Sequence, residues 1–433
     1  MKRFLQKFIP LVFLLVPSGA YSQAPLTGFS LSPEGFPFTF DSLPQFFTEV
    51  TQNCPGSVIY GSARWYDSAS AAGNVPAVAG LISGSTPTPY NYTSMVTLGW
   101  ATYPSTLYLD PQGGANNWTN AATRSLYLQT LASTADQNPA YLFVGNEVNF
   151  YIETDSLDYL NWVSFYHEAY DTIKAHSPQT KVGTVFNYEH LSGNGDNLNP
   201  IPWTAPHWSA LTLIDTAKMD VVAVNTYPFL QYLDVNSVPN NYLQPFFDTV
   251  GNKPVVITET GWPADDFGLA PWGASPAEQS AYVNKLFTMI SGQNVEAVNW
   301  LFLHYMMDYN QTIEDAVFCS ISMYDSTGVA YPAYALWQSH CAITAAPEIP
   351  AAGNEITIAP NPFSHTATIT LSENSSGVNQ FFLFDALGKK VRTSSFTGQS
   401  ATCARENLSP GFYFYRVTDE NGKLLGKGKL VIE

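Results

Sequence analysis

Eight short runs of apolar, β-branched and aromatic residues recur between residues 27 and 340, and they restrict the chain to very few folds. Most of the runs are continuously apolar rather than alternating, which is typical of parallel strands that are buried on both faces. Eight such strands with helical segments between them, over roughly 310 residues, predict an α/β fold of the (β/α)8 TIM barrel type. The predicted strands, with approximate edges, are Gly28–Leu31, Ser57–Trp65, Met95–Ala101, Leu142–Glu147, Val182–Asn187, Val221–Tyr227, Val255–Glu259 and Ala297–His304.

Two helix starts between these strands are marked by capping residues. Ser275-Pro276-Ala277-Glu278 combines a capping box with proline at the first helical position. Asp155 or Ser156 opens a second helix. Both helices follow predicted strands, as the barrel requires.

The two ends of the chain have a different character from the barrel. Residues 1–22 combine a basic start, an apolar run and small residues near a cleavage site, so we expect a secretory signal peptide that is removed before Gln23. Residues 23–342 form the predicted barrel, and residues 343–355 form a linker rich in Ala and Pro. Residues 356–433 contain short strands separated by turn signals and predict a small all-β sandwich. No later segment is long and apolar enough to predict a membrane span in the mature chain.

The composition limits the kinds of partner. Charged residues make up only 12% of the chain and aromatic residues 14%, a surface chemistry that suits neutral sugars, whose faces stack on aromatic rings. A large aromatic core under an ordinary secreted surface is the alternative explanation. The formal net charge of −17 argues against nucleic acid and against docking on anionic membranes.

Four cysteines could be oxidised in an exported chain. Cys319 and Cys341 flank one late loop, so we expect them to form a disulfide. Cys54 and Cys403 fall in different predicted domains and are expected to stay unpaired. The sequence contains no spacing typical of a metal site, and we predict neither a metal nor a cofactor.

Two glutamates each come directly after a predicted buried strand. Glu147 ends the fourth run and Glu259 ends the seventh. Catalytic groups of barrel enzymes lie at the carboxyl ends of the strands, and cleavage of a glycosidic bond needs two carboxyl groups. A charge after a strand can also simply mark the return of the chain to solvent, but here each glutamate lies in a particular motif.

The motifs Val144-Gly145-Asn146-Glu147 and Thr258-Glu259-Thr260-Gly261-Trp262-Pro263 resemble the active-site motifs of clan A glycoside hydrolases. The residues of these motifs are most similar to those of family 17 β-1,3-glucanases and family 53 endo-galactanases. The resemblance covers roughly residues 24–342. It implies that Glu147 is the acid/base, that Glu259 is the nucleophile, and that Asn146 binds the sugar 2-hydroxyl.

The resemblance extends to further candidate contacts. Tyr227, in Val-Asn-Thr-Tyr-Pro, resembles the clan tyrosine that hydrogen-bonds the nucleophile, with a core tyrosine as the alternative. Arg64, at the end of the second strand, could keep Glu259 ionised, or it could form a surface ion pair. Trp300 could form the aromatic floor of the sugar site, or it could be a core tryptophan. The other substrate-binding candidates are Trp262 and Asn187.

The C-terminal domain resembles the type IX secretion sorting domain. The motifs that carry this resemblance are Ala359-Pro360-Asn361-Pro362-Phe363, the segment from Phe384 to Val391, Leu408-Ser409-Pro410-Gly411-Phe412-Tyr413, and the terminal Gly-Lys-Leu-Val-Ile-Glu. The resemblance implies export through the periplasm and outer membrane to the cell surface or the medium, with the type IX machinery as a partner. A generic β-sandwich or sugar-binding module is the alternative.

The sequence as a whole predicts a secreted retaining glycosidase that cleaves a β-linked polysaccharide, of the β-glucan or galactan class, by double displacement. One alternative is a barrel at the cell surface that binds glycan without cleaving it. Another is a transglycosylase that uses the same residues.

Overall fold

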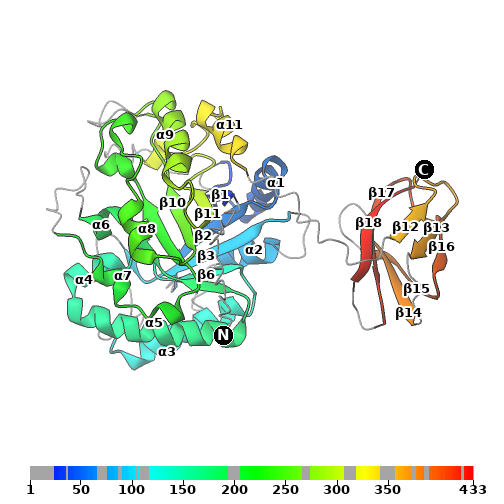
Figure 1. Ribbon diagram of the computed structural model, residues 1–433, viewed down its shortest axis with the longest axis horizontal. Helices are drawn as coiled ribbons and strands as arrows, with labels where there is room; N and C mark the ends of the chain where they lie inside the picture. Colours follow the sequence, from blue (N-terminus) through cyan, green and yellow to red (C-terminus); the bar gives the residue numbers. More distant parts are fainter. Residues whose placement is uncertain are drawn as a thin grey trace, which may run out of the picture.

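The computed structural model comprises a barrel and an all-β body, which are described separately below (Figure 1). It describes residues 24–35, 38–65, 76–85, 90–102, 106–107, 117–193, 205–265, 274–306, 318–341, 356–371, 377–384, 390–420 and 424–432. The predicted signal peptide and linker lie outside these residues. None of the helices in the described part of the chain is both long and apolar enough to cross a membrane.

A single parallel sheet forms the centre of the first body, and all eight predicted strands are present in it. The sheet order is β7-β6-β3-β2-β1-β11-β10-β9-β8. Each neighbouring pair is parallel, as continuous apolar runs predicted. The strands are β1 (Leu26–Ser30), β2 (Val58–Arg64), β3 (Thr93–Gly99), β6 (Tyr141–Val144), β7 (Lys181–Gly183), β8 (Val185–Asn187), β9 (Val222–Thr226), β10 (Val255–Thr260) and β11 (Val295–Trp300).

The fifth predicted strand is interrupted at Thr184, which links the two ends of the sheet. It separates β7, which pairs with β6, from β8, which pairs with β9. The Thr184 hydroxyl donates to the Val144 carbonyl at 2.8 Å, and the Thr184 carbonyl accepts from the Ala223 N–H at 3.3 Å. Because β7 and β8 are the two ends of the sheet order and Thr184 links them along the chain, the sheet forms a nearly closed (β/α)8 barrel.

Helices surround the sheet, as Figure 1 shows. Both predicted helix starts are confirmed: the Ser275 hydroxyl accepts from the Glu278 N–H at 3.2 Å, and the Asp155 carboxylate accepts from the Asp158 N–H at 2.9 Å. The helices are α1 (Leu43–Asn53), α2 (Pro76–Ser85), α3 (Ala121–Ala135), α4 (Asn149–Thr154), α5 (Ser156–His176), α6 (Tyr188–Ser192), α7 (Ser209–Thr212), α8 (Gln244–Val250), α9 (Pro276–Met289) and α11 (Pro332–Ser339).

Strand alternation divides the core into two parts. A small apolar cluster fills the inside of the barrel and includes Tyr60, Val185, Ala223 and Ala297. A much larger cluster lies between the strands and the helices. Successive residues of a strand point to opposite faces, so the inner cluster shows which side chains further along each strand also point inward.

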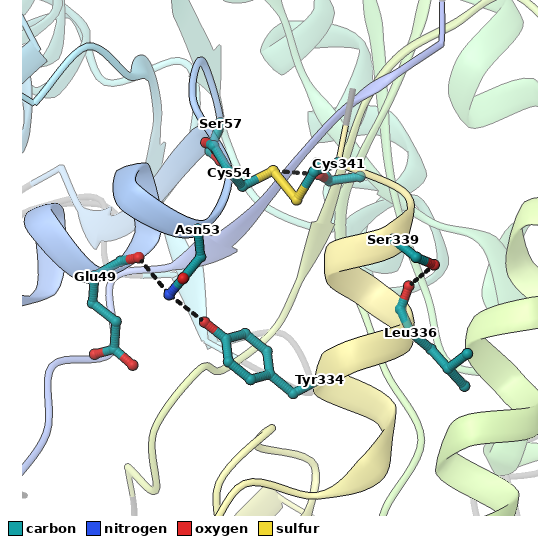
Figure 2. Close-up of a disulfide and its surroundings, with 9 residues drawn as sticks. Glu49, Asn53, Cys54, Ser57, Tyr334, Leu336, Ser339 and Cys341 are labelled. Atoms are coloured by element: carbon teal, nitrogen blue, oxygen red, sulfur yellow. Dashed lines mark hydrogen bonds between the residues drawn. A yellow bond between two sulfur atoms is a disulfide. The ribbon is translucent and has the colours of Figure 1, made fainter. Parts of the chain in front are cut away.

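The disulfide joins Cys54 to Cys341, so the predicted Cys319–Cys341 pair is wrong. Cys54 follows α1, Cys341 follows α11, and their Cα atoms are 5.5 Å apart although 287 residues separate them (Figure 2). Barrel closure explains the pairing: β1 and β11 are neighbours, so the helices that follow them are neighbours too. A bond from the Asn53 amide to the Tyr334 hydroxyl, at 3.1 Å, crosses the same boundary.

Two antiparallel sheets form the second body, which confirms the predicted all-β sandwich. One sheet has the order β12-β13-β16 and the other β15-β14-β17-β18. Apolar residues from both sheets, such as Ile369 and Leu383, form one core. The strands are β12 (Ile356–Ala359), β13 (Thr366–Leu371), β14 (Val378–Phe384), β15 (Lys390–Thr397), β16 (Ser400–Ala404), β17 (Gly411–Thr418) and β18 (Leu424–Ile432).

Candidate active site

Glu147 lies just beyond the carboxyl end of β6, on a tightly turned backbone. Gly145 has φ = 92° and Glu147 has φ = 49°, a region that residues other than glycine seldom occupy. A Cβ on Gly145 would lie 2.4 Å from the Trp100 Nε1, so only glycine fits there. This turn directs the Glu147 carboxylate to two amide donors: Asn187 Nδ2 lies 3.0 Å and Asn225 Nδ2 lies 3.1 Å from its Oε1.

Glu259 reaches the same end of the barrel because β10 contains an irregularity. Ile257 pairs with Val224, but the next residue of β9, Asn225, pairs with Glu259, so Thr258 is an extra residue. A β-bulge of this kind re-aims the side chain that follows it. Thr258 donates inward to the Asn225 Oδ1 at 2.7 Å, and the Glu259 Oε2 accepts from the Tyr227 hydroxyl at 2.8 Å. The bond predicted for Tyr227 is therefore present.

The two glutamates affect each other's charge. Burial and, to a smaller extent, the negative charge of Glu147 raise the pKa of Glu259 to about 7, against the opposing effect of the Tyr227 and Tyr60 hydroxyl groups. Part of the Glu259 side chain still reaches solvent, so the desolvation comes from the protein packed around the rest of it. Asn225, which donates to Glu147, also accepts from Thr258, the neighbour of Glu259, so the structure brings the two carboxyl groups into one site.

Asn225 connects the site and was not predicted from the sequence. Its amide nitrogen donates to Glu147 and also, at 3.3 Å, to the Asn146 Oδ1, while its oxygen accepts from Thr258. The two-residue repeat of side-chain direction along β9 could have identified Asn225 as an inward-facing residue. Ala223 belongs to the inner cluster; Asn225, on β9, and Tyr227, directly after β9, follow it at two-residue spacing.

The remaining sequence candidates separate into two groups. Asn187 ends β8 and contacts Glu147, and Arg64 is exposed at the end of β2, on the side of the strand that carries Tyr60. Trp300 and Trp262, by contrast, are fully buried in the outer core, and this corrects their prediction as substrate contacts. Their rings pack on Tyr282, at 6.0 Å and 5.4 Å respectively.

The position of Trp300 follows from strand alternation. Ala297 belongs to the inner cluster, so Asn299 also points inward and Trp300 points outward. Asn299 donates to the Ser30 hydroxyl inside the barrel, whereas the Trp300 indole donates to the Ile321 carbonyl at 2.7 Å in the outer core.

A third carboxyl group, Glu189, supports the site from outside it. Glu189 has no exposed surface, and its Oε1 accepts from the Thr226 hydroxyl at 2.8 Å, the Tyr227 backbone N–H at 2.9 Å and the Tyr242 hydroxyl at 2.9 Å. Burial raises the pKa of Glu189 to about 7. Glu189 therefore fixes the backbone at the end of β9, from which the Tyr227 ring reaches Glu259.

Glu189→Gln should lower kcat of the activity proposed below by about five- to tenfold and leave KM within about twofold, because it weakens charge-assisted bonds that hold Tyr227. In a Tyr227→Phe background the same change should cost less than about twofold, since both substitutions act through one contact. The matched control is Glu153→Gln, which alters a carboxylate bonded to His190 and His207 instead. Equal losses with and without the Tyr227 hydroxyl would contradict this role.

Among the described residues, no group of three or more His, Cys, Asp or Glu side chains could hold a metal ion. The groups that these residues bring to the site are two carboxyl groups, with amide and phenol donors around them.

Comparison with known proteins separates the two bodies. Residues 357–433 match the secretion system C-terminal sorting domain family. No curated protein matches the chain. The chain is similar in structure to the exo-β-1,4-mannosidase Op5Man5 from Opitutaceae bacterium strain TAV5, with 12% identity, a TM-score of 0.52, and coverage of 74% of this chain and 59% of that one.

The chain is also similar to Bacteroides uniformis β-glucuronidase 2, with 10% identity, a TM-score of 0.50, and coverage of 94% of this chain and 46% of that one. It thus spans about half the length of these two proteins, and at this identity the likeness concerns the fold. The sorting domain marks the chain for export to the cell surface or the medium. The chain is therefore a TIM barrel with a fold that glycoside hydrolases share, and its C-terminal part belongs to the secretion system sorting domain family.

Proposed function

We propose that the barrel is a retaining glycoside hydrolase that cleaves a neutral β-linked polysaccharide of the β-glucan or galactan class. The observation that carries the proposal is the coupled pair of carboxyl groups at the carboxyl ends of β6 and β10. Both side chains are held by donors from other strands of the barrel, which a protein that only binds sugar does not need. The low share of charged residues and the net charge of −17 favour a neutral polymer.

The two carboxyl groups take different parts in the reaction. In the first step, Glu259 attacks the anomeric carbon and Glu147 gives its proton to the departing glycosidic oxygen, which leaves a glycosyl ester on Glu259. In the second step, Glu147 takes a proton from water, and that water releases the sugar and restores both groups. Asn146 would contact the sugar 2-hydroxyl, Asn187 and Asn225 would orient Glu147, and Tyr227 would orient Glu259.

The charges of the two carboxyl groups are coupled. Each negative charge disfavours the other, so ionisation of one carboxyl group makes ionisation of the second less favourable. The reactive form that we propose has one proton on the pair, held by Glu147. The phenol donors favour the ionised form of Glu259, as a nucleophile requires.

Glu147→Gln should lower hydrolysis of the polysaccharide by about 10²–10⁴-fold, because it removes the proton donor. On an aryl glycoside whose leaving group needs no proton, activity should persist, and the pH profile of kcat/KM should lack the basic limb that reports loss of the Glu147 proton. The acidic limb, which reports ionisation of Glu259, should stay in place, because Glu147 is protonated and uncharged in that pH range. A basic limb that persists in the variant would contradict Glu147 as the proton donor.

A panel of neutral β-linked polysaccharides tests the function itself. Wild-type protein should release reducing ends from at least one β-glucan or galactan. Binding without any release would favour the non-cleaving glycan-binding barrel. Products longer than the starting oligosaccharide would favour a transglycosylase.

A further inference from the structure

The outer face of the four-stranded sheet in the sorting domain displays aromatic rings and cations. On β14, buried Phe381 and Leu383 alternate with partly exposed Phe382 and Phe384. On β17, Phe414 and Arg416 are exposed, and Phe414 retains 49% of its surface. Large aromatic groups in a sheet normally face the core, so rings on the solvent side of this sheet need another explanation.

The strand register brings these side chains together. Phe382 is paired with Arg416, and Phe384 is paired with both Phe414 and Lys390. The Arg416 guanidinium carbon lies 5.1 Å and the Lys390 Nζ lies 5.6 Å from the centre of the Phe382 ring. One ring therefore positions two cations by cation–π contact. Neither cation forms an ion pair with a carboxylate among the residues that the structure describes.

The charge of this domain contrasts with that of the rest of the chain. Residues 356–433 carry eight of the 18 Lys and Arg residues but only six of the 35 Asp and Glu residues, a formal charge of +2. The remaining residues therefore carry −19. Positive charge is concentrated in the domain that serves export.

We propose that this aromatic–cationic face, formed by Phe382, Phe384, Lys390, Phe414 and Arg416, docks on an acidic protein surface of the secretion machinery. Arg and aromatic side chains dominate the binding energy of protein interfaces. Cations that are already held by a ring lose little freedom when they pair with carboxylates. A protein surface is favoured over an anionic membrane because lipid recognition requires a larger cluster of cations, typically about 4–8. This inference rests on the sorting domain and is independent of the proposed glycosidase activity.

Export of the full chain from a bacterium with a type IX system tests the proposal. The doubly substituted Lys390→Gln/Arg416→Gln chain should reach the medium or the cell surface about tenfold less than wild type and accumulate in the periplasm. Phe414→Thr should reduce export in the same direction. The matched control is Thr357→Glu/Thr402→Glu, which changes the charge equally at exposed positions of the other sheet and should be exported normally.

Two further measurements keep the test decisive. Purified variants should melt at the wild-type temperature, which separates lost docking from lost folding, and a chain that ends at residue 355 should remain in the periplasm. Normal export of the Lys390→Gln/Arg416→Gln chain would overturn the proposal. So would binding of the full chain to phosphatidylcholine–phosphatidylglycerol vesicles that the same substitutions abolish, because the partner would then be lipid.

Discussion

Glu259→Gln should reduce polysaccharide hydrolysis by at least about 10⁴-fold, because an amide cannot form the glycosyl ester on which double displacement depends. The substitution preserves the shape of the side chain and an acceptor for the Tyr227 hydroxyl. Binding of the polysaccharide should therefore persist while turnover is lost. Release of reducing ends and a separate binding measurement on the same polymer distinguish the two effects.

Glu296→Gln is the matched control, since it alters a carboxylate on the adjacent strand β11. Glu296 is bonded to Lys181 and Tyr141 at 2.7 Å and 2.8 Å, at the amino ends of the strands and away from the site. It should leave activity within about twofold. Comparable activity in Glu259→Gln and wild type would remove Glu259 from the reaction.

The same substitution should not lower stability above pH 7. The pKa of Glu259 is higher in the folded chain, about 7, than in an unfolded chain, about 4.3. Between these values the folded state binds the extra proton, so the wild type loses stability as pH rises from about 4 to 7. Glu259→Gln removes that cost, and its melting temperature at pH 8 should equal or exceed that of wild type.

Cys341→Ser should lower the free energy of unfolding by about 3–5 kcal/mol, because the lost disulfide closes a loop of 287 residues. The melting temperature should fall by about 5–10 °C. Reductant should lower the midpoint of wild type to that of the variant and leave the variant unchanged. An equal midpoint for oxidised wild type and variant would show that the link between α1 and α11 contributes nothing.

The barrel was predictable because its strands are buried on both faces and its helices carry local caps. Continuous apolar runs such as Val255–Glu259 predict parallel strands, and Ser275 marks a helix start with its own bonds. These signals depend only on residues close together in the chain.

The errors came from features that depend on closure or on strand phase. The pairing of Cys54 with Cys341 exists only because β1 and β11 become neighbours when the barrel closes. We predicted Trp300 as a cleft residue, but Ala297 belongs to the inner cluster. Residues 297 and 299 of β11 therefore point inward, and Trp300 points outward. Asn225 was missed for the same reason, because it lies in phase with the inner cluster but in no recognisable motif.

Trapping the intermediate tests the central claim most directly. A 2-deoxy-2-fluoro glycoside of the sugar that wild type cleaves slows the second step and leaves the sugar bound to the nucleophile. After digestion with trypsin, mass spectrometry should find the added sugar on the peptide of residues 219–285, which contains Glu259. The account predicts no such addition on residues 125–174, which contain Glu147. A sugar attached to that second peptide, or active protein that never acquires one, would contradict Glu259 as the nucleophile of a retaining glycosidase.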